Sequence, residues 1–91
     1  MGDRCSVNVK IVNRLGLHAR PAMAFVDLAT TFACDVQVAK SDTVVDGKSI
    51  MQMMMLAASQ GTELSITADG ADAERACAAL KELVESGFDE E

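Results

Sequence analysis

The sequence predicts an α+β fold: a two-layer, open-faced β-sandwich in which a four-stranded, mostly antiparallel sheet is covered on one face by three helices. Three segments alternate apolar and polar residues, a pattern typical of strands with one buried face, and a fourth is a short strand after a turn. Three further segments read as helices, which gives the order β-α-β-β-α-β-α. Because each strand has a single apolar face, one layer of helices is enough to cover the sheet.

The strands are predicted from short alternating runs. Residues 5–11 (CSVNVKI), 34–40 (CDVQVAK) and 63–68 (ELSITA) alternate, and 43–46 (TVVD) is a short strand after a turn at 41–42. In each run the apolar positions share one side of the pleated chain, because successive strand residues point to opposite faces. The other face of the sheet is therefore expected to meet solvent.

The first and third helices are predicted from amphipathic spacing. Residues 19–32 place apolar side chains at helical intervals, and Pro21 suits the first turn, where a missing N–H costs nothing. Residues 70–87 carry an apolar stripe built from Ala73, Ala76, Cys77, Leu80, Leu83 and Val84. Gly87 is the expected C-cap of this third helix, since glycine readily adopts the left-handed conformation.

The middle helix is predicted within residues 47–59 (GKSIMQMMMLAAS). Ser49 is the expected N-cap, and Gln52, three residues later, would complete a capping box. This helix is apolar nearly all round, and a thin core has no room for every methionine. Some methionine side chains are therefore expected on the surface, although a wholly buried helix is the alternative.

Composition limits the function. The 91 residues are enough for one domain, residues 1–91, with little room for a deep pocket. Aromatic residues make up 3% and the net charge is −6, which disfavours nucleic acid and anionic membranes as partners. No apolar run is long enough for membrane insertion and no signal peptide is seen, so a cytoplasmic location is expected. The odd, widely spaced cysteines Cys5, Cys34 and Cys77 are expected to be buried free thiols.

The only histidine and the only proline of the chain lie in RLGLHARPAM, residues 14–23. A histidine with an unperturbed pKa near 6.5 is partly neutral at pH 7 and is a competent nucleophile. If a helix begins just after His18, its first N–H groups and its dipole form an anion site. Arg20 lies in the same turn and can donate charge-assisted hydrogen bonds to phosphate. These residues favour a phosphate at or on His18; a lone surface histidine beside an ordinary arginine is the alternative.

Other chemistries find little support in the same residues. A single histidine without a CxxC motif predicts no metal site, and no acid is placed to orient the imidazole in a catalytic triad. No cofactor is expected either.

The strings GLHARPA (residues 16–22) and GKSIM (residues 47–51) resemble those of the HPr family, the histidine-containing phosphocarriers of the bacterial phosphoenolpyruvate-dependent phosphotransferase system. The resemblance spans roughly residues 5–87. It implies that His18 accepts a phosphoryl group on Nδ1 from phosphorylated enzyme I and donates it to a IIA-type protein. It also implies that Arg20 contacts the phosphate and that Pro21 begins the helix. Such a protein is a carrier and not a self-sufficient enzyme.

By the same resemblance, Ser49 is a regulatory serine phosphorylated by an ATP-dependent HPr kinase/phosphorylase. A plain N-cap is the alternative, since capping alone is a sufficient reason for a serine there. In many kinase-regulated relatives a glycine follows KSIM, whereas this chain has Gln52.

The resemblance also implies a docking face made of Met23, Ile50, Met51 and Met54. Some relatives carry lysines on the outer side of the first helix, where this chain has Asp27 and Thr30. Partner choice is therefore open: the chain can be a sugar-transport carrier, or mainly a regulatory interaction protein controlled through Ser49. A monomer is expected, because a relay protein must dock and leave quickly.

Overall fold

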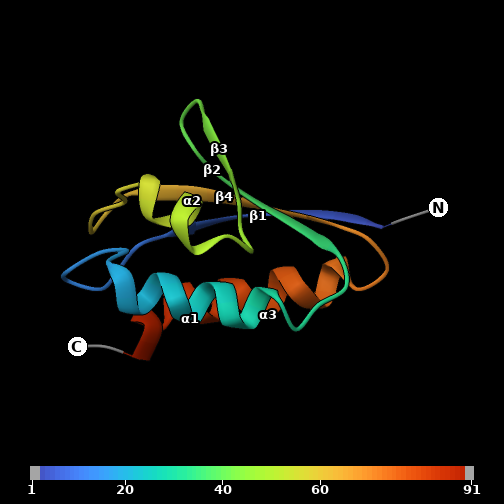
Figure 1. The fold of residues 1–91 in the computed structure, drawn as a ribbon. Coiled ribbons are helices and arrows are strands. Elements are labelled where there is room, and N and C mark those ends of the chain that lie inside the picture. Colours follow the sequence, from blue (N-terminus) through green and yellow to red (C-terminus); the bar gives the residue numbers. More distant parts are fainter. Residues whose placement is uncertain (1–2, 90–91) are drawn as a thin grey trace.

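The computed structural model describes residues 3–89, and its elements follow the expected order (Figure 1). The strands and helices are β1 (Arg4–Lys10), α1 (Ala19–Ala29), β2 (Asp35–Lys40), β3 (Thr43–Asp46), α2 (Ile50–Met55), β4 (Glu63–Asp69) and α3 (Ala73–Glu85). A short 3₁₀ turn at Gly87–Asp89 follows α3.

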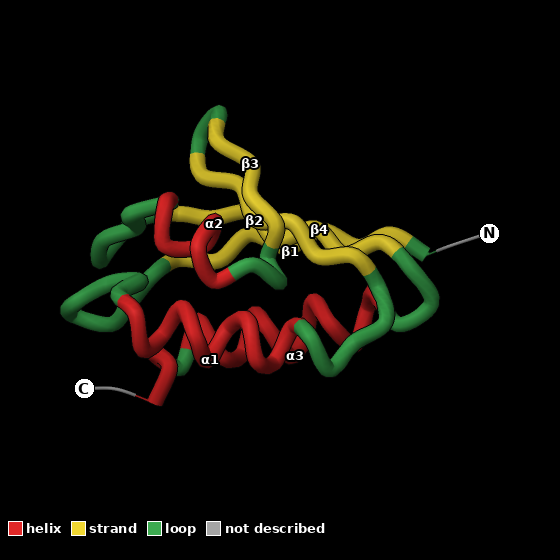
Figure 2. The backbone as a smooth tube through the Cα atoms, viewed as in Figure 1, coloured by secondary structure: helices red, strands yellow, loops and turns green. Residues whose placement is uncertain are grey.

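The four strands form one sheet in the order β1-β4-β2-β3, and every pair of neighbours is antiparallel. Val7, Ile66 and Val38 are aligned across three strands on the helix-covered face. Figure 2 shows α1 and α3 lying side by side along that face, while α2 packs against α1 and β3. On the opposite face most side chains are polar, and the Ser6 and Thr67 hydroxyls are hydrogen-bonded at 2.9 Å; Ala39 and the exposed Val44 are apolar residues on this face. The predicted open-faced sandwich is confirmed.

The core fills the space between the sheet and the helices. Each layer contributes large, fully buried side chains, among them Phe25 from α1, Met53 from α2, Ile66 from β4 and Leu80 from α3. Because apolar burial is the main favourable term in folding, this shared core fixes where each helix begins relative to the sheet. Among the helices within residues 3–89, none has the length and apolar content needed to cross a bilayer.

Helix α1 ends at Ala29, three residues before the predicted end at residue 32. The hydroxyl groups of Thr30 and Thr31 donate hydrogen bonds to the carbonyls of Asp27 and Leu28, at 2.9 and 2.6 Å. The Leu28 carbonyl also accepts the N–H of Thr31 at 3.1 Å. Local bonds from Thr30 and Thr31 thus satisfy carbonyls of the last turn, so the chain can leave the helix there.

At the start of α2 the predicted N-cap is confirmed, but the predicted capping box is wrong. Ser49 Oγ accepts a hydrogen bond from the N–H of Gln52 at 3.3 Å. In a capping box the Gln52 side chain would return to the N–H of Ser49. That N–H already donates to the carbonyl of Asp46 at 3.1 Å, so Gln52 Oε1 accepts from the N–H of Asp46 instead, at 2.9 Å.

The three cysteines are free thiols, as expected. Cys34 and Cys77 are buried, and Cys5 is partly buried. Cys77 Sγ donates to the carbonyl of Cys5 at 3.2 Å, and burial together with the neighbouring Cys5 raises the pKa of Cys77 to about 11. The thiolate is the reactive form of cysteine, and a raised pKa disfavours it. Cys77 is therefore assigned to the packing of the core.

Candidate functional site

His18 is the N-cap residue of α1. Its backbone is extended (φ −81°, ψ −173°), its side chain makes no capping hydrogen bond, and the residue is partly exposed. The first helical hydrogen bond runs from the N–H of Ala22 to the carbonyl of His18 at 3.0 Å. The N–H groups of Ala19 and Arg20 therefore have no acceptor within the helix, and Pro21 has no N–H at all. Together they place the positive end of the α1 dipole beside the imidazole.

The backbone just before His18 is held by a close approach between two loops. Gly16 has φ +71°, and a Cβ at this position would lie 2.5 Å from the carbonyl oxygen of Ala58. The next residue, Leu17, donates its N–H to that same carbonyl at 2.8 Å. Only glycine combines this conformation with this contact at no steric cost, so the sequence fixes the loop that presents His18.

Asn13, which is not among the site residues predicted from the sequence, supports the same loop from inside. Its side chain is 2% exposed, and Nδ2 donates to the carbonyl of Gly16 at 2.7 Å. Asn13 also accepts the N–H of Gly16 on its own carbonyl at 3.1 Å. The sequence does contain an indication of this role: Asn13 is a polar residue at the next inward-facing position after Val9 and Ile11. Such a buried polar residue indicates a specific hydrogen bond.

A depression of about 790 Å³ opens next to the start of α1. It is lined by Arg14, Leu15, Arg20, Pro21, Ala24, Phe88 and Asp89. Two guanidinium side chains thus lie on one side of the helix end that carries His18, and they add positive charge to that of the helix dipole. Asp89 shares this depression with Arg20, whereas Glu90 and Glu91 lie outside the described residues.

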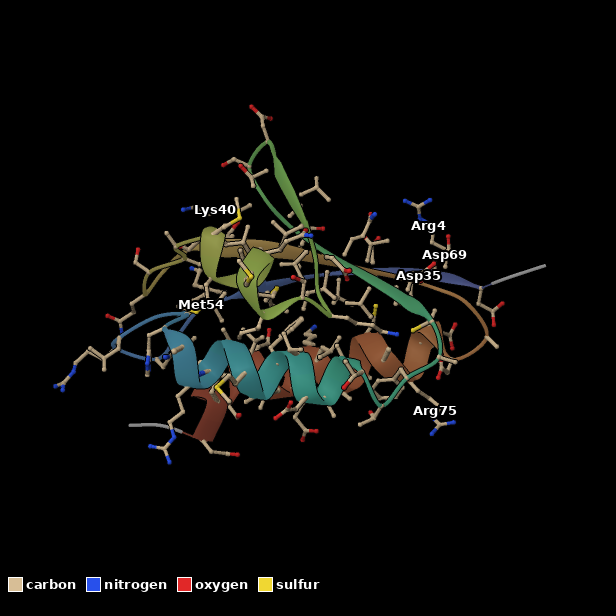
Figure 3. All side chains as sticks on the ribbon, viewed as in Figure 1. Arg4, Asp35, Lys40, Met54, Asp69 and Arg75 are labelled. Atoms are coloured by element: carbon tan, nitrogen blue, oxygen red, sulfur yellow. The ribbon has the colours of Figure 1, made fainter. Side chains whose placement is uncertain are left out.

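An apolar surface covers α2 and the outer side of α1. Met23, Met51 and Met54 are 55%, 78% and 44% exposed, which agrees with the expected surface methionines. Figure 3 shows Met54 pointing from α2 toward the beginning of α1. Ile50 is partly buried and packs against the core, so it is less exposed than these three methionines.

Two exposed residues that the sequence analysis did not name belong to the same kind of surface. Leu15 is 68% exposed in the loop before His18, and Met55 is 74% exposed at the end of α2. We refer to Leu15, Met23, Met51, Met54 and Met55 as the methionine surface. Exposed apolar side chains on two contacting helices and on the loop before the first favour a protein-interaction surface.

The turn that presents Ser49 is held by side chains of the turn as well as by backbone bonds. The N–H of Lys48 donates to Asp46 Oδ1 at 2.9 Å, and Lys48 Nζ donates to the carbonyl of Phe32 at 2.8 Å. The second bond ties the turn to the segment that follows α1. Ser49 itself is partly exposed at the N-cap of α2, one residue before the helix that carries most of the methionine surface.

The comparisons with known proteins agree with this architecture. The family model described as "PTS HPr component phosphorylation site" matches residues 5–86. The phosphocarrier protein HPr of Neisseria meningitidis is 46% identical over 83 residues, which cover 91% of this chain and 93% of that protein. The phosphocarrier protein NPr of Proteus mirabilis is 44% identical over 84 residues, covering 91% and 93%.

A solved structure gives the same answer. The crystal structure of HPr from Thermoanaerobacter tengcongensis superimposes with a TM-score of 0.92 at 45% identity, covering 96% of this chain and 98% of that one. Fold and sequence therefore define a phosphotransferase-system carrier protein. The chain belongs to the HPr family of phosphocarrier proteins.

Proposed function

We propose that His18 accepts a phosphoryl group on Nδ1 from phosphorylated enzyme I and passes it to a IIA-type protein. The observation that carries this proposal is the place of His18 at the N-cap of α1, with a side chain that does not cap the helix. The imidazole can therefore take and release a substituent while the helix keeps its hydrogen bonds.

The surroundings suit the transfer step. As the bond between Nδ1 and phosphorus forms, the bond from phosphorus to the donor breaks, and its electron pair stays on the donor. The charge that develops on the ring is relieved by loss of the Nε2 proton to water. The guanidinium of Arg20 and the N–H groups of the first turn of α1 face the charge on the phosphoryl oxygens. The product is a reactive phosphoramidate, which can be handed to a second protein.

The experiment is phosphotransfer in solution. The protein is mixed with enzyme I and phosphoenolpyruvate, and its intact mass is measured before and after mild acid. We expect one added, acid-labile phosphate on the wild type and none on His18→Ala. Circular dichroism verifies that the variant is folded. A wild-type protein that takes no phosphate, or an equal gain on His18→Ala, contradicts the proposal.

We propose further that Ser49 is phosphorylated by an ATP-dependent HPr kinase/phosphorylase. Its N-cap position supports this, because a phosphate at a helix N-terminus can accept the hydrogen bond that the hydroxyl now accepts from Gln52. The doubly charged group would lie at the edge of the methionine surface. Charge at such an edge weakens docking through desolvation.

The kinase proposal has its own test. With kinase and ATP, the wild type should gain an acid-stable phosphate that Ser49→Ala does not gain. The Ser49 phosphoprotein should then accept phosphate from enzyme I more slowly than the unmodified protein. Equal rates would contradict the regulatory role.

A second candidate is a mainly regulatory phosphocarrier without a sugar-transport role. Matches to carriers named HPr and NPr are of nearly equal identity, so family membership favours neither branch. Transfer from phosphorylated His18 to IIA proteins of sugar permeases, compared with regulatory IIA proteins, separates the two. In either branch we propose a cytoplasmic monomer whose partners are proteins, without nucleic-acid binding or membrane insertion.

A further inference from the structure

An acidic residue lies on the outer side of α1 at a place where the helix itself does not favour it. Asp27 is exposed, and it follows Arg20 and Met23 along one side of the helix at intervals of seven and four residues. Residues three, four and seven apart share a helix face, so these three side chains form one exposed stripe. Arg20 is at the His18 end of the stripe and Asp27 at the other end.

The position of Asp27 is unfavourable for the isolated helix. It lies in the last turn of α1, where the dipole is negative and cations are preferred, and this turn contains no basic residue. Among residues 3–89 no cation forms an ion pair with its carboxylate, and the one hydrogen bond there, from the Thr30 hydroxyl, goes to the Asp27 carbonyl. The last turn of α3 likewise carries acids, Glu82 and Glu85, and no basic residue, so Asp27 is distinguished by its place on the stripe with Arg20 and Met23.

The charge along this side of the molecule is therefore divided. Arg14 and Arg20 outnumber the neighbouring Asp89 and leave the His18 end positive, whereas Asp27 makes the far end of α1 negative. Met23 lies between Arg20 and Asp27. A phosphorylated donor brings a negatively charged phosphoryl group toward the positive end. Electrostatic complementarity then calls for a positive group on the same donor opposite Asp27.

We propose that Asp27 determines partner specificity by pairing with a lysine or arginine on the phosphoryl donor of this protein. The inference rests on the proposed phosphotransfer to His18, since the donor is defined by that reaction. In the complex, the charge that disfavours the end of α1 becomes half of an ion pair at the rim of the docking surface. Asp27 is thus a specificity residue that touches neither the phosphate nor His18.

The test compares the effects of Asp27 on docking and on stability. In the phosphotransfer assay with the cognate enzyme I at low salt, Asp27→Asn should raise KM about two- to fivefold, and Asp27→Lys about tenfold or more. The value of kcat should remain unchanged. Added salt should shrink both differences, because exposed charges are screened. The thermal midpoint of both variants should stay level or rise, since they remove an acid from the negative end of a helix.

Asp42 supplies the matched control. It is an exposed aspartate in the turn between β2 and β3, which projects away from α1 (Figure 1). Each Asp42 variant, Asp42→Asn or Asp42→Lys, changes the net charge by as much as the corresponding Asp27 variant. Both should leave KM within about twofold of the wild-type value. Equal KM values for Asp27→Lys and Asp42→Lys would overturn the proposal.

Further outcomes locate the cause. If a charge reversal of one basic residue on the enzyme I surface restores the KM of Asp27→Lys, the ion pair is established. If the variants lose kcat and thermal stability together, Asp27 has a structural role and the proposal is wrong. A wild-type protein that takes no phosphate from enzyme I contradicts the phosphotransfer function itself, which is a distinct result.

Discussion

Helices α1 and α2 begin in similar ways, and each carries at its N-cap a side chain for which we propose phosphorylation. His18 and Ser49 both have extended backbones, with φ of −81° and −113°. They differ in what the side chain does. Ser49 Oγ accepts the N–H of Gln52 and so caps its helix, whereas the His18 side chain makes no capping bond.

The two helix beginnings are consequently held by different parts of the chain. Before α1 the hold is mostly backbone contact between loops, through Gly16, Leu17 and Ala58, with Asn13 as the supporting side chain. Before α2, side-chain bonds of Asp46, Lys48 and Gln52 add to backbone bonds such as that from the N–H of Gly47 to the Val36 carbonyl at 2.8 Å. A carrier residue that must be modified and unmodified in every cycle thus stands where modification breaks no bond that caps its helix. The proposed regulatory residue stands where modification acts on the helix cap.

The largest expected effect comes from Gly16→Ala, which attacks the backbone hold of His18. The added methyl group meets the Ala58 carbonyl at 2.5 Å, and φ of +71° is unfavourable for alanine. We expect the free energy of unfolding to fall by at least about 2 kcal/mol, measured by urea denaturation. The rate of phosphorylation by enzyme I should fall with it, because the loop that presents His18 must shift.

Gly61→Ala is the control for Gly16→Ala. Gly61 has φ +91° but no atom lies within 4 Å of an added Cβ, so only backbone strain remains. We expect a loss of about 1 kcal/mol with an unchanged phosphorylation rate in the folded protein. If both variants lose the same stability and the same rate, the loop contact at Gly16 is not what positions His18.

The beginning of α3 extends the comparison with a third use of an N-cap side chain. Asp72 does not cap its own helix; its carboxylate accepts the N–H groups of Ala33 and Cys34, both at 2.9 Å. These hydrogen bonds, foremost that from Ala33, lower the pKa of Asp72 below its ordinary value. Asp72→Asn should therefore lower the thermal midpoint at pH 7 by several degrees, because the amide accepts these bonds less well.

The pH dependence of the Asp72 effect has a defined sign. A carboxyl whose pKa is lower in the folded state contributes stability above its unfolded pKa of about 3.9, and this contribution is lost as the pH falls through the folded value. The difference in midpoint between the wild type and Asp72→Asn should accordingly shrink below about pH 4. Thermal scans between pH 7 and pH 2 measure it, with Asp42→Asn as the exposed control. A constant difference over this range would contradict the assignment.

Ser49→Ala and His18→Ala test the central difference directly. Loss of the Ser49 cap should cost about 1 kcal/mol of unfolding free energy. His18→Ala should change it by less than about 0.5 kcal/mol, because no capping bond is removed. Urea denaturation of both variants gives the two values. A larger loss for His18→Ala would show that the imidazole also holds its helix.

The alternating runs and the helical spacing were sufficient to predict the order of elements and the buried face, because both follow from local periodicity. Helix ends were less predictable. The end of α1 depends on the hydroxyls of Thr30 and Thr31 returning to nearby carbonyls, a choice that the apolar spacing of Phe32 obscured. The capping box failed for a similar reason, since the N–H of Ser49 found the Asp46 carbonyl first.

For the site, the sequence indicated the reactive group but not what holds it. His18, Arg20 and Pro21 are adjacent in the chain, so a helix beginning there was enough to bring them together. Gly16 owes its role to a contact with Ala58, 42 residues away, which no local pattern reveals. The exposure of Leu15 depends likewise on tertiary packing.

The smallest expected effects come from two glutamines, each of which bonds to the segment that precedes one of the two helices. Gln52 Oε1 accepts the N–H of Asp46 before α2, and Gln60 Nε2 donates to the carbonyl of Val12 in the loop that leads to His18, at 3.0 Å. Both side chains are exposed, so each alanine variant should lose only about 0.5–1 kcal/mol by urea denaturation.

Amide hydrogen exchange shows where the loss falls. Gln52→Ala should speed exchange at Asp46 and leave Gly16 unchanged, because Gln52 Oε1 is the acceptor of the Asp46 N–H. Gln60→Ala should leave both amides protected, since the Gly16 loop is held by its backbone contacts with Ala58. Faster exchange at Gly16 in Gln60→Ala would mean that a side chain also holds the loop before α1. The proposed difference between the segments before α1 and α2 would then be wrong.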